Sequence, residues 1–416
     1  MSSVAVVGSG VSGLTASYVL GRSRDVTLFE ADDRFGGHAH THQVDDAHSV
    51  DSGFIVHNDR TYPLLRRLFA ELDVAVHPTE MSMSIHCDGC GLEYAGGRGA
   101  AGIFAQRRRV ADPRFLRMLT SIKRFQRLAL ALLDEDEAAD EPQTYGDFLR
   151  VHRFSDHFVA HYAIPVVSCV WSSGHETALA YPARYLFAFL KHHGFLSIKG
   201  SPQWFTVQGG SQAYVRKVTE AVGDVRSSTP IRAISRKPDG VEILDAHGEV
   251  HRADSVVIAT HADDALALLT DPTDDERRIL GAFEYSRNET VLHRDGSLLP
   301  DAESARSSWN YRMDDCSTRL DQTAVTYWMN RLQGFESDEP FVVTLNSTDR
   351  IDPATVIASM HYTHPIYTTA SVAALRELPS LSTGRTAFAG SYHGWGFHED
   401  GCRSGVEAAS ALGVDW

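Results

Sequence analysis

Two short apolar runs near the start of the chain enclose a segment with helical spacing. Residues 4–7 (VAVV) and 26–30 (VTLFE) are patterned as buried strands, and the chain between them turns through glycines into a helix that ends near Leu20. A strand, a helix and a second strand in this order predict a βαβ unit. Residues 255–260 and 386–390 are similarly apolar and predict further buried strands.

The middle of the chain contains two insertions with different patterns. Residues 96–203 are mostly helical by periodicity, whereas residues 276–380 are rich in strand-forming runs. The helical spacing is shown by Met118, Leu119, Ile122, Phe125, Ala129 and Leu132. Between the insertions we expect a helix at about 212–222, a strand from Ile231 and a hairpin at 241–250.

The glycines of residues 8–13 (GSGVSG) lie where the first strand turns into the helix. Gly8 permits the tight turn, Gly10 lets the backbone approach a pyrophosphate at the helix N-terminus, and Gly13 lets helix and strand pack closely. Glu30, at the end of the second strand, is placed to accept a hydrogen bond from a ribose hydroxyl. The pattern predicts a dinucleotide-binding site.

The motif continues beyond Glu30, because Arg34-Phe35-Gly36-Gly37 follows directly. With this continuation the chain resembles flavoproteins of the glutathione-reductase-like FAD type, in particular the amine oxidase and phytoene desaturase superfamily. The resemblance implies FAD instead of a nicotinamide nucleotide, and an α/β fold with a Rossmann-like FAD-binding domain interleaved with an α+β substrate domain. We expect residues 1–95, 204–275 and 381–416 to form the FAD-binding domain, and 96–203 and 276–380 to form the substrate-binding domain.

Residues 396–405 (GFHEDGCRSG) resemble the C-terminal FAD segment of this superfamily and should lead into a helix at 406–412. The resemblance implies that the amides of Gly401 and Cys402 donate to the pyrimidine edge of the isoalloxazine and stabilise the reduced flavin. Asp400 is expected to cap that helix or, with Glu399, to shape the flavin's electrostatics. We expect the FAD to be non-covalent. The candidate cofactor-binding residues are Gly8, Ser9, Gly10, Val11, Ser12, Gly13, Glu30, Ala31, Arg34, Gly36, Gly37, His38, Ile231 near the adenine, Thr260 near the pyrophosphate, Gly390, Glu399, Asp400, Gly401 and Cys402.

A narrower resemblance extends over most of the chain. Residues 36–41 (GGHAHT), 51–58 (DSGFIVHN), 308–311 (SWNY), 327–333 (YWMNRLQ) and 396–401 (GFHEDG) resemble a bacterial group of predicted FAD-binding proteins. That group is related to fatty-acyl-modifying flavoenzymes, including the desaturase used in furan fatty acid formation. The resemblance implies that the substrate is a lipid acyl chain.

The function implied is that of an FAD-dependent oxidoreductase, foremost a desaturase or dehydrogenase of a fatty-acyl or other apolar lipid, in which hydride passes from a substrate C–H bond to flavin N5. Phe397 stands where monoamine oxidases carry a tyrosine of their aromatic cage, so an amine would lose one expected wall. Amine oxidation, redox-neutral isomerisation and a non-catalytic flavin-bound lipid carrier remain alternatives.

The candidate catalytic residues are His398, Tyr362 and His361. His398 could act as an acid or base near the flavin, or could stabilise the turn. Strand alternation places His361 and Tyr362 on opposite faces, and only one face can meet the substrate. Lys199 could correspond to the lysine that holds a water at flavin N5 in amine oxidases, or could lie at the surface.

The sequence predicts no metal site. His38, His40 and His42 alternate along the chain, but no acid or cysteine partner is evident. Five cysteines do not suggest a disulfide framework. Cys87 and Cys90 flank an Asp-Gly hairpin signal without a second Cys pair, which favours a turn; a strained, reducible bridge is the alternative.

Charge narrows the choice of partners. A net charge of -15 argues against nucleic acid. No apolar run approaches the roughly 18 residues of a spanning helix, and the chain begins with a strand, not a signal peptide, so we expect a cytoplasmic protein. Residues 107–127, the basic segment, could dock on anionic lipid at the inner face of the cell membrane or form a solvated face. Its charges are Arg107, Arg108, Arg109, Arg114, Arg117, Lys123, Arg124 and Arg127.

Overall fold

A parallel sheet organises one lobe of the molecule. The computed structural model describes residues 2–135, 143–197, 200–317, 319 and 322–416. All four strand pairs of this sheet are parallel, as expected from the βαβ pattern and the buried apolar runs. In spatial order the strands are β10 (Asp224–Arg226), β2 (Asp25–Phe29), β1 (Ser3–Val7), β14 (Ser255–Ile258) and β20 (Thr386–Phe388). Strands from the first and last thirds of the chain are therefore neighbours, as a site shared by both ends requires.

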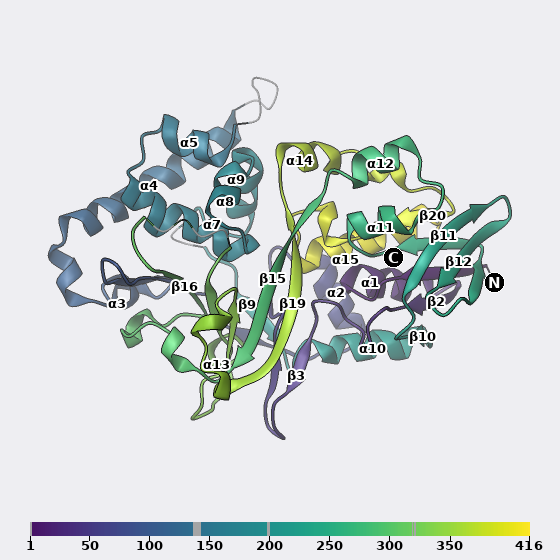
Figure 1. Ribbon diagram of the computed structural model, residues 1–416, viewed down its shortest axis with the longest axis horizontal. Coiled ribbons are helices and arrows are strands. Elements are labelled where there is room, and N and C mark those ends of the chain that lie inside the picture. The colour runs from purple at the N-terminus through teal and green to yellow at the C-terminus, as the bar shows by residue number, and fades with distance from the viewer. Residues whose placement is uncertain (1, 136–142, 198–199, 318, 320–321) are drawn as a thin grey trace.

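Alternating residues of β1 serve two separate hydrophobic cores. Val4 and Val6 face a core formed with one set of helices, and Ala5 and Val7 face the other. A parallel sheet covered on both faces accounts for the continuous apolar runs of its strands. The helices of this lobe are α1 (Val11–Leu20), α2 (Pro63–Glu71), α10 (Gln212–Val222), α11 (Ala262–Leu268), α12 (Asp274–Leu280), α14 (Thr369–Leu375) and α15 (His398–Ala411). Figure 1 shows them at the right, with purple α1 beside yellow α15.

The described residues also form three smaller antiparallel sheets. An antiparallel sheet contains the predicted hairpin and consists of β11 (Ile231–Lys237), β12 (Gly240–Asp245) and β13 (Val250–Ala253). A second pairs β5 (Val56–Asn58), β9 (Trp204–Val207) and β6 (Val76–Thr79), and a third pairs β3 (Thr41–Gln43) with β4 (Ser49–Asp51).

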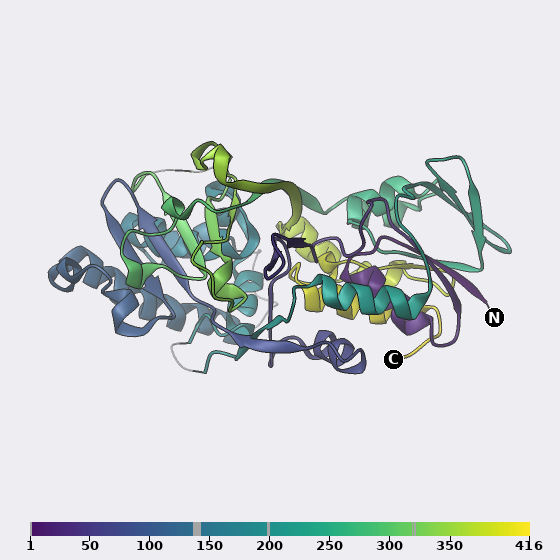
Figure 2. The same ribbon diagram turned by 90° about the horizontal axis from the view of Figure 1, so that it is seen from below.

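A seven-stranded sheet and a group of helices form the second lobe, at the left of Figure 1. The strand order is β19 (Val356–Ile366), β15 (Glu284–His293), β18 (Val342–Leu345), β17 (Val325–Trp328), β16 (Trp309–Met313), β7 (Met83–Cys87) and β8 (Leu92–Gly96). The helices are α3 (Gly99–Ile103), α4 (Pro113–Asp134), α5 (Tyr145–Val151), α6 (Asp156–Phe158), a π-helical turn (Val159–Ala163), α7 (Ile164–Trp171), α8 (His175–Ala180), α9 (Ala183–His192) and the short α13 (Met329–Leu332). Figure 2 shows the two lobes side by side along the long axis.

The domain boundaries in the structure differ from those expected from the sequence. Strands β7 and β8, which the sequence assigned to the FAD-binding domain, belong to the seven-stranded sheet because β7 pairs with β16. Conversely, α12 and α14 supply Ile279, Leu280 and Ala374 to the core beneath the parallel sheet, although both helices fall within the expected substrate segment 276–380. Within the described residues no helix combines the length and apolarity that crossing a bilayer demands.

Candidate active site

A cavity of about 810 Å³ lies between the two lobes and reaches from the first βα turn to the aromatic residues of the helical insertion. Most sequence-predicted site residues line it. These are Gly8, Ser9, Gly10, Val11, Ser12, Glu30, Ala31, Arg34, Gly37, His38, Ile231, Thr260, Gly390, His361, Tyr362 and His398. The remaining candidates, Gly13, Gly36, Glu399, Asp400, Gly401 and Cys402, are not among the described lining residues.

The glycine turn at the start of α1 is shaped for close approach. Gly8 has φ +99°, and a Cβ there would lie 2.6 Å from the carbonyl oxygen of Ala259. A Cβ on Gly13 would lie 1.9 Å from Gly8 O, so the helix packs directly against the turn. Gly10 is the N-cap of α1 and contributes no side-chain cap. The first amides of α1 therefore point into the cavity mouth without a capping acceptor, which suits an anionic group.

Glu30 is held in place at the end of β2. Its Oε2 accepts from Ser9 N at 2.9 Å and from the Ser9 hydroxyl, and its Oε1 accepts from Asp32 N at 2.9 Å. The carboxylate thus lines the cavity beside the glycine turn. This position agrees with the ribose contact predicted from the sequence, which stays a prediction.

A second glycine loop lies against the first. Arg34 Nη1 donates to Gly37 O at 2.8 Å, and a Cβ on Gly37 would lie 3.2 Å from Gly10 Cα. The next residue, His38, has a buried Nε2 without a hydrogen-bond partner. Burial and the nearby His364 hold the pKa of His38 well below its usual range, so the imidazole is neutral. A buried polar nitrogen beside two glycine loops fits a bound polar ligand.

The C-terminal helix begins earlier than the sequence predicted. Instead of spanning 406–412, α15 runs from His398 to Ala411. Gly401 N donates to Phe397 O at 3.0 Å, so this amide is used within the helix. The expected donor role of Gly401 and Cys402 is therefore wrong, and the amides without an intrahelical partner are those of the first turn, beginning at His398.

The two acidic residues of the C-terminal segment, Glu399 and Asp400, accept hydrogen bonds from backbone amides instead of facing the cavity. Glu399 accepts from the amides of Leu64 and Leu65, at 2.9 and 3.0 Å, at the start of α2. Burial raises the pKa of Glu399 to about 7. Asp400 accepts from the amide of Phe397 at 3.1 Å, and Phe397 is the N-cap, so Asp400 is the third helical residue and not the cap. Contrary to the expectation from the sequence, neither side chain is among the described residues that line the cavity.

Gly401 and Cys402 lie at the contact between α15 and α1. A Cβ on Gly401 would lie 2.6 Å from Val11 Cγ1. Cys402 is fully buried, and Thr15 Oγ1 donates to its Sγ at 3.5 Å. Both residues thus allow the two helices to pack closely, which brings the N-terminal turn and the C-terminal segment to one side of the cavity.

The helical insertion and the seven-stranded sheet supply an aromatic end to the cavity, which we call the substrate end. Its walls include Cys169, Val170, Trp171, Phe189, Phe195, Trp309 and Tyr327, and Phe397 adjoins them. The rings of Phe189 and Phe397 stack with centroids 4.9 Å apart. Trp171 Nε1 donates to Trp395 O at 3.0 Å. The sequence-based candidates omitted Trp171 and Phe189, because in a helical insertion they cannot be told from core aromatics.

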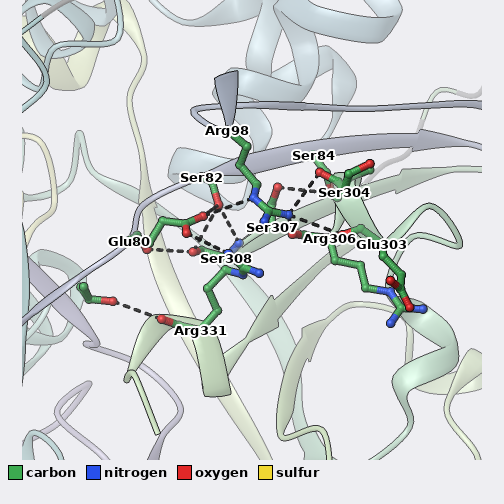
Figure 3. A network of polar contacts seen from close by, with 12 residues as sticks. Glu80, Ser82, Ser84, Arg98, Glu303, Ser304, Arg306, Ser307, Ser308 and Arg331 are labelled. Carbon is green, nitrogen blue, oxygen red and sulfur yellow. Dashed lines mark hydrogen bonds and ion pairs between the residues drawn. The ribbon is translucent and has the colours of Figure 1, made fainter. Parts of the chain in front are cut away.

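A polar network fixes the sheet residues at this end (Figure 3). Glu80 accepts from Arg331 Nη1 at 2.8 Å and from the Ser82 hydroxyl at 2.7 Å. Trp309 N donates to Ser82 O at 3.0 Å, which ties β16 to the start of β7. Met81 and Trp309 both line the cavity. The network fixes the backbone next to each of these residues.

Comparison with known proteins agrees with this geometry. Residues 11–291 match the model of a protein family described as flavin containing amine oxidoreductase. The chain belongs to this family. Among solved structures, cyclohexylamine oxidase from Brevibacterium oxydans is similar, with 17% identity, a TM-score of 0.72 and coverage of 99% of this chain and 98% of that one. The fatty acid isomerase of P. acnes that produces CLA has 16% identity, a TM-score of 0.70 and 99% coverage of both chains. A comparison with curated proteins finds no match.

The protein is accordingly an FAD-dependent oxidoreductase with a Rossmann-like fold. The residues present fit FAD: the uncapped start of α1 suits the diphosphate, Glu30 lines the cavity beside it, and the buried His38 Nε2 has no hydrogen-bond partner within the protein. Non-covalent attachment of the FAD stays a prediction; Cys402, the cysteine of the flavin segment, is buried between helices.

His398 is positioned as a packed, neutral ring at the cavity. It stacks on Phe54 with centroids 3.6 Å apart, and its Nε2 lies 3.2 Å from the Tyr214 hydroxyl. Burial lowers the pKa of His398 to about 3. At neutral pH this imidazole therefore carries no charge and cannot serve as a proton-donating imidazolium.

Tyr362 and His361 occupy opposite faces of β19, as strand alternation predicts. The Tyr362 hydroxyl lies 2.7 Å from Ser52 Oγ and 3.0 Å from His40 Nδ1, and its ring lies 4.9 Å from that of His38. Burial raises the pKa of Tyr362 to about 12, so its hydroxyl stays protonated. His361 is exposed and borders the cavity from the other face. Lys199 lies outside the described residues.

Proposed function

We propose that this enzyme oxidises a C–H bond in an apolar, fatty-acyl lipid. The observation that carries the proposal is the composition of the cavity walls. Within the described part of the chain, the helical insertion and the seven-stranded sheet contribute no Asp, Glu, Lys or Arg to those walls. His193, a polar residue there, has its pKa lowered to about 3 by burial and is neutral. An acyl chain gains roughly 0.8 kcal/mol for each methylene that such walls take from water.

The charged lining residues lie instead in the lobe to which we assign the nucleotide. Glu30, Asp32, Arg34, Arg232 and Asp264 all come from the lobe of the parallel sheet. Bound FAD supplies the hydride acceptor. The protein's part is then to orient the substrate against it and to exclude water.

Amine oxidation is the second candidate, because a similar structure is that of a cyclohexylamine oxidase. An aromatic wall can receive an ammonium group through its ring faces. Phe189 and Phe397, however, offer no hydroxyl and lie among uncharged neighbours. The similarity to a fatty acid isomerase also keeps redox-neutral conversion as an outcome to be tested.

Anaerobic mixing with a substrate panel should separate these functions. We expect unsaturated or methylated phospholipids to bleach the flavin absorbance, and primary amines to leave it unchanged. Glycerophosphate headgroups without acyl chains are the matched control and should not bleach it. A Phe189→Leu variant removes one aromatic ring from the cavity wall but keeps the wall apolar, and it should slow reduction of the flavin by the lipid. Phe205→Leu, at a residue that is not among the described lining residues, should not slow it.

The other outcomes have distinct meanings. Rapid bleaching by amines alone would make amine oxidation the better assignment. Conversion of a fatty acid without net bleaching, followed by chromatography of the product, would indicate an isomerase. Neither bleaching nor conversion by any member of the panel, with tight lipid binding, would indicate a carrier.

We further propose that the basic segment docks on an anionic membrane surface, from which an acyl substrate would come. Val110 is 56% and Leu116 38% exposed, and exposed arginines lie nearby in the sequence at positions 107, 108, 114 and 117. Arg109 is paired with Asp112 at 2.8 Å, whereas Arg107 and Arg117 project outward. Exposed apolar side chains within a basic surface are typical of interfacial binding.

Vesicle flotation tests this docking. The protein should float with phosphatidylglycerol vesicles at low salt and remain in solution with phosphatidylcholine. Replacing Arg107 and Arg117 with Gln should weaken binding by roughly 1 kcal/mol for each charge. Arg252→Gln with Arg277→Gln, an equal charge change on the other lobe, is the control. Equal loss in both double variants would mean that only net charge matters, and would contradict the docking site.

A further inference from the structure

Three cysteines and a histidine from distant parts of the chain meet in the second lobe. The side chains are Cys87, Cys90, His161 and Cys316, and their ligand atoms all lie within 4.8 Å of one another. Cys87 Sγ is 4.0 Å from Cys316 Sγ, and Cys90 Sγ is 3.5 Å from His161 Nε2. All five cysteines of the protein are free thiols, so no disulfide accounts for the approach.

The fold itself brings these segments together. Cys87 ends β7, and Cys90 lies in the turn before β8. Strand β16 pairs in parallel with β7, placing Met313 beside Cys87, and the turn that follows β16 carries Cys316. A Cβ on Gly89 would lie 2.7 Å from Asp315 Cα, so the two turns touch through their backbones.

The spacing matches tetrahedral coordination. With Zn–S bonds of about 2.3 Å and Zn–N bonds of about 2.0 Å, tetrahedral ligands lie about 3.8 Å apart for two sulfurs and about 3.5 Å for sulfur and nitrogen. The Cys87–Cys316 and Cys90–His161 distances lie close to these values. The other pairs of ligand atoms lie within 4.8 Å of one another, at most about 1.3 Å beyond these values. Side-chain rotation can close that difference. A disulfide would instead require two sulfurs at about 2.05 Å.

His161 is oriented as a ligand. Its Nδ1 donates to His157 O at 3.0 Å, and its other ring nitrogen, Nε2, lies 3.5 Å from Cys90 Sγ. Its own carbonyl accepts from the Tyr94 hydroxyl at 2.7 Å. Metal-binding histidines characteristically use the second ring nitrogen in this way. His161 lies in the π-helical turn, a distortion that in helices often marks a functional position.

The surroundings suit a negatively charged centre. Three thiolates with one divalent cation carry a net negative charge, and the adjacent backbone is held by guanidinium groups. Arg109 Nη2 donates to Cys90 O at 2.8 Å, and Arg108 Nη2 donates to Gly91 O at 3.0 Å. Cys87 and His161 are fully buried, whereas Cys90 and Cys316 are half-buried and leave a path from solvent.

We propose that Cys87, Cys90, His161 and Cys316 form a structural zinc site. Thiolate and imidazole ligands in a compact set of four favour Zn²⁺, and four protein ligands leave no open position for a substrate. Binding would release the thiol protons to solvent and would fasten the β7–β8 hairpin to β16 and to the helical insertion. The site is independent of the flavin cavity. The sequence pattern did not reveal the site, because His161 and Cys316 come from two segments far from Cys87 and Cys90 in the chain.

Metal analysis of the purified holoenzyme tests the proposal. Protein expressed with zinc in the medium should contain about one zinc ion per chain. Cys90→Ser and Cys316→Ser should contain almost none, whereas Cys169→Ser, a buried cysteine outside the cluster, should retain it. Removal of the metal with a chelator should lower the unfolding temperature of the wild type, and added Zn²⁺ should restore it.

A second measurement on the wild type covers variants that fail to fold. After reduction and chelation, Co²⁺ should give the d–d absorption of a tetrahedral thiolate site in the red, where oxidised flavin does not absorb. Wild-type protein that takes up neither zinc nor cobalt would overturn the proposal. An intact mass lower by two hydrogens would reveal a disulfide and would also overturn the proposal. Iron found in place of zinc would overturn the choice of metal.

Discussion

Replacing Gly10 with alanine should weaken FAD binding a hundredfold or more without disturbing the fold. A Cβ at this position meets no atom within 4 Å, and the backbone there has φ −61°, which alanine adopts freely. The added methyl instead projects at the start of α1, where the diphosphate would rest on the first amides of the helix. Hydrogen bonds to charged groups contribute about 1.5–3 kcal/mol each, so losing two should weaken binding by a hundredfold or more.

Gly384→Ala is the matched control, because Gly384 is exposed and also has open space around its Cβ. Both variants should keep the unfolding temperature of the apoprotein, measured by circular dichroism. FAD affinity, measured by quenching of flavin fluorescence, should fall only in Gly10→Ala. Acid denaturation should release intact FAD from the wild type and from Gly384→Ala. Unchanged affinity in Gly10→Ala would show that the diphosphate does not lie on α1.

The nucleotide-binding end could be predicted because its determinants are local. The glycine turn, Glu30 and the two strands lie within one short stretch, and each residue's role follows from the turn that its neighbours form. The structure places Gly8, Gly10 and Glu30 together on the cavity wall. The first and last segments of the chain, both assigned to FAD binding from the sequence, lie together through the close packing of α1 on α15.

The C-terminal segment could be predicted only in part, because hydrogen bonds from backbone amides occupy both of its acids. Asp400 before a glycine has the pattern of a helix N-cap, but the backbone amides of Trp395 and Phe397 occupy its carboxylate. Glu399 is occupied by amides of α2, which lies more than 300 residues earlier. Local hydrogen bonds therefore engage Asp400 and tertiary ones engage Glu399, so that neither acid is left to face the cavity.

The second lobe was least accessible to sequence reasoning. Ser84 in β7 hydrogen-bonds to Asn310 in β16 at 2.7 Å, although the two are 226 residues apart in the chain. No local pattern predicts the pairing of β7 with β16, so the sequence placed β7 and β8 in the FAD-binding domain instead of the second lobe. The same pairing brings Cys316 to Cys87, and a motif search confined to neighbouring cysteines could not find that contact.

Buried histidines should make the protein unfold steeply below about pH 5. His57 and His293 have their pKa lowered to about 4, and His193 and His393 to about 3, in each case chiefly by burial. These rings are neutral in the folded protein but titrate near pH 6.5 when unfolded. Their contribution to stability is complete above pH 6.5 and is lost as the pH falls toward the folded values. At pH 4.5 each should cost about 2–3 kcal/mol.

Two carboxyl groups act in the opposite direction. Burial raises the pKa of Asp51 to about 6 and that of Glu399 to about 7, so both bind protons more readily when folded and gain stability as the pH falls. Their gain at pH 4.5 is about 2–3 kcal/mol each. Four histidines therefore outweigh two acids by a margin comparable with the 5–15 kcal/mol that stabilises a typical domain.

Acid titration followed by circular dichroism should show a cooperative loss of structure between about pH 5 and pH 4. His57→Phe is the informative variant, because His57 Nδ1 has no hydrogen-bond partner and its ring packs against Phe69 and Phe205. Removing this one titrating group should move the midpoint to lower pH and reduce proton uptake on unfolding by about one. His247→Gln, at an exposed turn, should leave the midpoint unchanged. A wild type that stays folded at pH 4, or an equal shift in both variants, would mean that buried histidines do not set the acid limit.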